Sequence, residues 1–246
     1  MTLPPDPDRL AALITTAAGG REQVRPQTAG RAVAVCAGKG GSGCSLLATG
    51  LAQAAAGMLV DLAAGHDDAA ERLGCLPGRT LDDAAPLDGD LGAEALRGLS
   101  SMHPDGWRLV ARPADPAAIS PQLARALVRE SRAIASLTAF DLGVAASEST
   151  AAVAVSCDRA LLVTEPDRRA VACAARAAAW LEHRGMPAGS LGLVVNRWRR
   201  GGDLSLRGIE RAAGLPILAA VRDGGLAHGD RRSSALAELL RGLEAG

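Results

Sequence analysis

Short apolar runs alternate with longer amphipathic stretches along most of the chain. Seven runs are bounded by Gly, Pro, Asp or Asn and have the length of buried strands. They cover Val33–Ala37, Met58–Asp61, Trp107–Ala111, Leu142–Ala146, Ala160–Thr164, Leu191–Asn196 and Ile217–Val221. Helices are predicted between them over Ser45–Ala56, Asp67–Leu73, Ala93–Leu99, Pro121–Leu137, Asp167–His183, Ser205–Ala213 and Ser233–Leu243. The alternation predicts an α/β fold, a mostly parallel sheet of about seven strands with helices on both faces.

The first 30 residues lack this rhythm. They are polar, are broken by Pro and Gly, and contain at most one short helix over Arg9–Ala18. Residues 1–30 are therefore predicted to be a tail. Residues 31–246 are predicted to form a single domain, since a chain of 246 residues can bury a large core.

Composition excludes several classes of protein. The formal net charge is zero, which does not favour nucleic acid as a partner. No apolar run approaches the roughly 18 residues that span a bilayer, and the N-terminus does not resemble a signal peptide. The five cysteines form no C-x-x-C pair, which is typical of reduced thiols in the cytosol. A cytoplasmic location is expected.

A glycine-rich segment follows the first predicted strand and holds the chain's single lysine, Lys39. An apolar strand, a glycine loop and then a helix is the layout of a phosphate-binding P-loop, G-x-x-x-x-G-K-[ST]. Gly38, Gly43 and Ser45 fit that pattern, but Cys44 stands where the phosphate lysine belongs. Ser45 occupies the position of the hydroxyl that binds Mg²⁺. The candidate nucleotide-binding residues of the loop are Gly38, Lys39, Gly40, Gly41, Ser42, Gly43, Cys44 and Ser45.

The replacement of the lysine by Cys44 predicts weak nucleotide binding. Backbone N–H groups of a glycine loop and a helix N-terminus can hold phosphate without a lysine. The lysine normally adds charge-assisted hydrogen bonds worth about 1.5–3 kcal/mol each. Cys44 either fills space at the helix start or is a redox-sensitive thiol with a pKa lowered by the helix N-terminus. The glycine run could also be a plain tight turn, with Lys39 a solvated loop residue.

At these residues the chain resembles the MinD/ParA ATPases, whose deviant P-loop reads K-G-G-x-G-K-[ST]. The resemblance implies that Lys39 reaches across a dimer interface to the partner's nucleotide. Asp61 matches the first aspartate of the family's D-x-D segment, while Ala63 replaces the second, which positions the attacking water. Ala146 stands in place of the Walker B aspartate. Asp141 is predicted at the start of its strand, which argues against its replacing that aspartate.

Later segments extend the resemblance to roughly residues 32–243. Cys157–Pro166 is similar to the family's A-D-x-v-l-l-V-t-x-P strand. Asn196 and Arg197 match the late N-R pair, whose asparagine borders the adenine, so both are candidate nucleotide-binding residues. The arginine-rich run Arg197–Arg200 reads either as a contact for the base, DNA or lipid, or as an exposed loop. The leucines of the last predicted helix could bind membrane, as in MinD-type proteins, or pack on the sheet.

Within the family, the chain is most similar to the CpaE/TadZ branch, including actinobacterial CpaE-like proteins also called septum-site-determining. That branch usually carries an N-terminal receiver-like domain, for which residues 1–30 are too short. The resemblance implies a homodimer, and a protein partner from secretion, pilus or division machinery. It leaves open a peripheral contact with the inner face of the membrane.

Three functions are consistent with these residues. The first is a degenerate ATPase that binds ATP or ADP, with Mg²⁺, weakly at most and acts by docking. The second is a slow but genuine ATPase switch that cycles between a monomer and a nucleotide-sandwiched dimer. The third is a scaffold that needs no nucleotide. The loss of three groups used in phosphoryl transfer favours the first.

Overall fold

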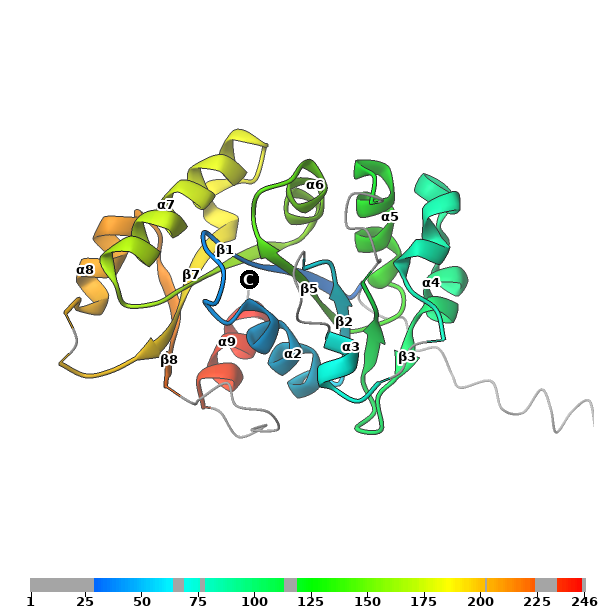
Figure 1. Ribbon diagram of the computed structural model, residues 1–246, viewed down its shortest axis with the longest axis horizontal. Coiled ribbons are helices and arrows are strands. Elements are labelled where there is room, and N and C mark those ends of the chain that lie inside the picture. Colours follow the sequence, from blue (N-terminus) through cyan, green and yellow to red (C-terminus); the bar gives the residue numbers. More distant parts are fainter. Residues whose placement is uncertain are drawn as a thin grey trace, which may run out of the picture.

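A twisted sheet of eight strands, with helices on both faces, forms the body of the protein (Figure 1). The structure is a computed structural model, and it describes residues 29–63, 69–75, 78–112, 119–201, 203–223 and 234–244. The strand order is β3-β4-β2-β5-β1-β6-β7-β8, and every pair is parallel except β3 with β4. The strands are β1 Arg31–Ala37, β2 Met58–Asp61, β3 Ser101–Met102, β4 Arg108–Val110, β5 Leu137–Val144, β6 Arg159–Thr164, β7 Leu191–Trp198 and β8 Ile217–Arg222.

The helices divide between the two faces of the sheet. Helices α2, α3 and α9 cover one face, and α4 to α8 cover the other (Figure 1). A separate apolar cluster fills the space under each layer, as expected when parallel strands bury both sides. The helices are α2 Cys44–Ala54, α3 Ala69–Arg72, α4 Ala93–Leu99, α5 Pro121–Ser131, α6 Glu148–Ser156, α7 Arg168–His183, α8 Leu206–Ala213 and α9 Ser234–Glu244, with 3-10 turns η1 Leu81–Asp90 and η3 Ala188–Ser190.

The predicted fold class is confirmed, and the starts of the two helices that follow Ser120 and Asp167 were placed within one residue. Ser120 caps α5, with Pro121 at its first position, and accepts a hydrogen bond from the Leu123 amide. Asp167 caps α7 and accepts from the Ala170 amide at 2.8 Å. Side-chain acceptors of this kind satisfy amides that the helix itself leaves without partners.

The predicted boundary between α5 and β5 is wrong. The helix ends at Ser131 rather than Leu137, and β5 begins at Leu137 rather than Leu142. Residues 132–136 separate the two elements, and Ala133, Ile134 and Ala135 among them continue the apolar pattern, so hydrophobic periodicity does not mark where the helix ends. The strand ends at Val144, two residues before Ala146.

One helix and one strand were not predicted, nor were the 3-10 turns η1 and η3. Helix α6 follows Ser147, whose side chain and that of Thr150 form a reciprocal capping box, a signal present in the sequence. The two-residue strand β3 adds an antiparallel edge beside β4, which raises the strand count from about seven to eight. The predicted helix Arg9–Ala18 lies outside the described residues.

The leucines of α9 pack on the sheet. Leu236, Leu239 and Leu243 are buried in the cluster under α2, and Leu236 lies against Gly50. The apolar side of this helix is therefore used for packing, as one of the two interpretations expected. Among the residues that the structure describes, no helix combines the length and apolar character needed to cross a bilayer.

Candidate phosphate-binding site

The glycine loop lies at the carboxyl edge of the sheet, between β1 and α2. Strand β1 runs between β5 and β6, so the loop is next to the ends of both of these strands. Ligands of open α/β sheets bind at this edge, where neighbouring strands send their connections to opposite faces. Helix α6 leaves β5 on the face opposite α2, which makes this position a topological switch point (Figure 1).

Glycine is needed in the loop for two different reasons. Gly41 and Gly43 have left-handed backbones, with φ of 79° and 98°, which favour glycine. Gly38 is needed for space, because a Cβ there would come within 2.2 Å of the Cys173 carbonyl. Gly40 and Gly41 face open space, and Gly43 begins α2 without a side-chain cap. No side chain caps the first amides of α2, which is the arrangement that a P-loop offers to an anion.

Two buried polar side chains, Ser42 and Asn196, donate hydrogen bonds to the backbone of the glycine loop. The Ser42 hydroxyl donates to the Lys39 carbonyl at 3.2 Å. The Asn196 Nδ2 donates to the Ser42 carbonyl at 2.9 Å, and Asn196 is itself buried. Asn196, which the resemblance predicted to border the adenine, is thus brought to the loop, where it fixes the loop's backbone.

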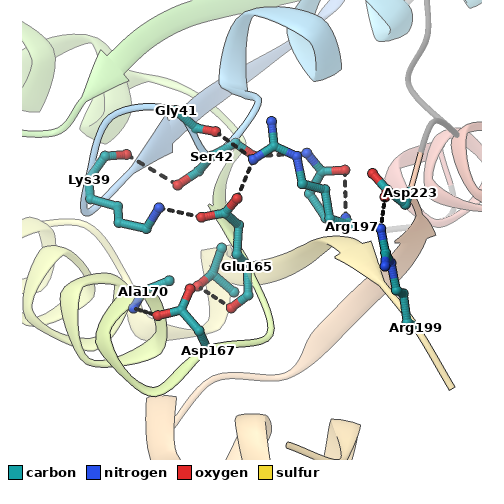
Figure 2. Close-up of polar contacts among 11 residues, drawn as sticks. Lys39, Gly41, Ser42, Glu165, Asp167, Ala170, Arg197, Arg199 and Asp223 are labelled. Atoms are coloured by element: carbon teal, nitrogen blue, oxygen red, sulfur yellow. Dashed lines mark hydrogen bonds and ion pairs between the residues drawn. The ribbon is translucent and has the colours of Figure 1, made fainter. Parts of the chain in front are cut away.

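Lys39, the single lysine of the chain, pairs with a carboxylate of its own chain. The Lys39 ammonium donates to Glu165 Oε2, and Arg197 Nη1 donates to Glu165 Oε1, so both cations share one carboxylate (Figure 2). Glu165 follows directly after β6. Burial alone raises the pKa of Glu165, but the hydrogen bonds from Lys39 and Arg197 outweigh that effect and hold the pKa below its usual value. The carboxylate is therefore ionised at neutral pH.

Arg197 reaches the loop from an unusual backbone conformation. Its φ is 55°, a left-handed value that costs a long side chain energy. The β7–β8 pairing is irregular at this point, and Asn196 Oδ1 accepts the Arg197 amide at 2.9 Å. Arg197 Nη1 also donates to the Gly41 carbonyl at 3.2 Å. The sequence identified Arg197 by its motif, but it missed Glu165, whose only signal is a charge at the carboxyl end of a predicted strand.

Cys44 is a buried, neutral thiol at the first position of α2. Burial, and less strongly the Asp141 carboxylate and the Cys36 thiol, raise the pKa of Cys44 well above its usual value. The expectation that the helix N-terminus lowers this pKa is wrong as a net effect, because desolvation dominates. Cys44 lies in the apolar cluster under α2, so the interpretation as a space-filling residue is correct. Ser45, at the predicted Mg²⁺ position, begins the helix beside it and is half-buried.

Two buried carboxylates, Asp61 and Asp141, lie side by side on β2 and β5. Asp61 accepts hydrogen bonds from the Ala63 amide at 3.1 Å and the Ala69 amide at 3.2 Å. Burial, and then the Asp141 carboxylate, raise the pKa of Asp61 to about 7. Asp141 is the fifth residue of the eight in β5 rather than its first, so its predicted place at the strand's start is wrong. Its carboxylate is close enough to raise the pKa of Cys44.

The residues present fit a phosphate group better than a magnesium ion. Both oxygens of Asp61 already accept backbone amides, and alanines stand at positions 63 and 146. In the described part of the chain, no three His, Cys, Asp or Glu side chains are grouped so as to hold a metal. Ser45 alone remains of the expected Mg²⁺ ligands. The open glycine loop, by contrast, keeps the geometry that receives an anion.

Arg199, in the same arginine-rich run as Arg197, has a different partner. Arg199 pairs with Asp223 (Figure 2). With Trp198, these two residues line a shallow hollow of about 430 Å³. Of the basic run, Arg197 is the residue that contacts the glycine loop.

Known proteins are similar to this chain in sequence or in fold. An uncharacterized protein of Mycobacterium tuberculosis is 34% identical over 231 residues, covering 88% of this chain, and the chain spans 61% of that relative's length. A ParA family ATPase from Chlorobium tepidum matches 87% of this chain and 99% of its own, with a TM-score of 0.75 and 18% identity. No family model matches the chain.

Two archaeal MinD structures are also similar. The cell division ATPase MinD of Pyrococcus furiosus has a TM-score of 0.72 and 20% identity over 88% of this chain and 99% of its own. The septum site-determining protein MinD of Pyrococcus horikoshii, complexed with Mg-ADP, has a TM-score of 0.71 and 18% identity over 87% of this chain and 96% of its own. The chain therefore has the fold of the MinD/ParA P-loop ATPases.

Proposed function

We propose that this chain is a degenerate MinD/ParA-like protein that binds ATP or ADP weakly at most and acts as a dimerising localisation or docking factor. The sequence motifs point to the CpaE/TadZ branch, hence to pilus or secretion assembly or to septum-site placement. A fold by itself is a weak guide to function, so the proposal depends on the site. A cytoplasmic location is inferred from the sequence.

The observation that carries the proposal is the neutral, buried thiol of Cys44 at the phosphate-lysine position. Alanines at positions 63 and 146 remove two further groups. Enzymes catalyse phosphoryl transfer mainly by positioning the reactants and stabilising charge. Each of these losses typically lowers the rate by about two or more orders of magnitude. The open glycine loop supports retained, weak binding of a phosphate group without turnover.

A slow ATPase switch remains the second candidate, because the structure brings Asp61 and Asp141 together under the loop. Their shared burial leaves one of the two able to hold a proton near neutral pH. A nucleotide-independent scaffold is the third candidate. Val144, at the end of β5 beside the start of the loop, is 41% exposed and offers apolar surface for a dimer.

Three measurements on purified protein separate the three candidates. We expect no ATP turnover above the buffer blank with Mg²⁺, and weak nucleotide binding by calorimetry. Steady turnover that disappears in Lys39→Ala would overturn the proposal in favour of the switch. Sedimentation then distinguishes the modes of assembly. Dimers that form only with ATP indicate the switch, and dimers formed by protein that binds neither ATP nor ADP indicate the scaffold.

A further inference from the structure

The side chains around Glu165 form a compact charged cluster that the proposed function does not explain. One carboxylate neutralises two cations, Lys39 from the glycine loop and Arg197 from the end of β7 (Figure 2). The three residues come from three different segments that meet at the mouth of the loop. The exposed fractions of the Lys39 and Glu165 side chains are 29% and 17%, so solvent only partly screens this pair.

The position of Arg197 relative to the loop suggests what the cluster is for. Its guanidinium touches the Gly41 carbonyl, at the part of the loop that faces open space. The buried Asn196 side chain donates a hydrogen bond to the Ser42 carbonyl and accepts one from the Arg197 amide. It therefore fixes the position of Arg197 relative to the loop. A left-handed backbone at a residue with a long side chain persists only where the surrounding contacts require it.

We propose that Arg197 and Lys39 form a cationic clamp for a pyrophosphate group, and that Glu165 occupies this clamp until such an anion displaces it. Arg197 thereby supplies the phosphate-directed positive charge that Cys44 lacks. This proposal rests on the proposed function, since it takes the loop as a phosphate site. The pyrophosphate group belongs either to a nucleotide or to free pyrophosphate.

Charge and geometry support displacement by a phosphate group. Guanidinium and ammonium groups bind phosphate and carboxylate oxygens through the same charge-assisted hydrogen bonds. A pyrophosphate carries more negative charge than the carboxylate. It can also accept hydrogen bonds from the uncapped amides at the start of α2. Glu165 directly follows β6 and accepts hydrogen bonds from Lys39 and Arg197, whereas the first amides of α2 have no side-chain cap. The resident carboxylate thus lowers affinity without closing the loop.

The test compares pyrophosphate and ADP binding by calorimetry in wild type and Glu165→Gln. The amide keeps the shape of the side chain but removes the competing charge. We expect both anions to bind about tenfold or more tightly to the variant, by similar factors, because the clamp contacts phosphate alone. Adding Lys39→Gln or Arg197→Gln to Glu165→Gln should abolish the gain.

A matched control is Asp223→Asn, which releases Arg199 from its own carboxylate outside the loop. This variant should leave both affinities unchanged. Circular dichroism and thermal unfolding establish that each variant is folded. The clamp is overturned if folded Glu165→Gln binds neither anion, or binds them no more tightly than wild type. It is also overturned if only ADP binding improves, or if the gain in affinity survives the loss of Arg197. Steady ATP turnover by wild type would overturn the proposed function alone.

Discussion

Gly38 lies directly against the backbone of Cys173, so that the start of the glycine loop and the middle of α7 touch without a side chain between them. A Cβ built on Gly38 would come within 2.2 Å of the Cys173 carbonyl carbon and oxygen. No side-chain rotation relieves a clash between backbone atoms. This contact fixes the loop against the helix that follows Glu165.

We therefore predict that Gly38→Ala destabilises the protein by about 2–4 kcal/mol, because either α7 or the loop must move. The matched control is Gly40→Ala, since Gly40 lies in the same loop with open space around it. It should change the free energy of unfolding by less than about 1 kcal/mol. Urea denaturation of the two variants checks this difference. Equal stabilities would show that the contact with α7 is not tight.

The five cysteines should differ sharply in reactivity. All are free thiols; Cys36, Cys44, Cys75 and Cys157 are buried, while Cys173 is half-exposed. Thiolate is the reactive form, and burial raises the pKa of Cys44. At pH 7.5, iodoacetamide should modify Cys173 first and leave Cys44 largely unlabelled, as read by peptide mass spectrometry. Rapid labelling of Cys44 in folded protein would restore the interpretation as a redox-sensitive thiol.

Sequence patterns predicted the sheet and the loop because both depend on local signals. Short apolar runs specify buried strands, and the spacing of Gly38, Gly43 and Ser45 specifies a strand-loop-helix turn. The capped helix starts at Ser120 and Asp167 were found for the same reason. Between α5 and β5, the apolar residues Ala133, Ile134 and Ala135 continue the pattern past the end of the helix, so the sequence carries no such signal and the boundary was misplaced.

The charge network could not be read from the sequence because its members are far apart along the chain. Lys39 and Glu165 are separated by 126 residues, and parallel pairing of β1 with β6 brings them together. The pairing of Asp61 with Asp141 likewise depends on the register of β2 against β5. Resemblance placed Asn196 and Arg197 near the nucleotide, but their contacts with the loop required coordinates.

The raised pKa of Asp61 makes the stability of the fold depend on pH. The folded-state pKa is about 7, against 3.8 for an ordinary aspartate, so the folded state binds more protons between these values. The contribution of Asp61 to stability is therefore complete below about pH 4 and is lost as pH rises toward 7. One proton gives a slope of at most about 1.4 kcal/mol per pH unit.

Replacing Asp61 with Asn should remove this part of the pH dependence. The amide cannot titrate, although its nitrogen cannot accept the second amide hydrogen bond, so some stability is lost at every pH. Urea midpoints between pH 4.5 and 7.5 should therefore fall less steeply in Asp61→Asn than in wild type. If the urea midpoints of the two proteins changed equally with pH, a group other than Asp61 would cause the pH dependence. Asp82→Asn, an exposed carboxylate of η1, serves as the control and should retain the wild-type slope.

Restoring the missing lysine tests whether the loop still has the shape of a phosphate cradle. In Cys44→Lys, the new side chain begins at the first residue of α2, beside the uncapped amides of the loop. One regained charge-assisted hydrogen bond of about 1.5–3 kcal/mol corresponds to roughly a tenfold or greater gain in ADP affinity. The control is Cys44→Ser, which is small and uncharged and should leave ADP affinity near the wild-type value. If folded Cys44→Lys bound ADP no better than Cys44→Ser, the loop would be a structural turn, and the proposed nucleotide site would have to be abandoned.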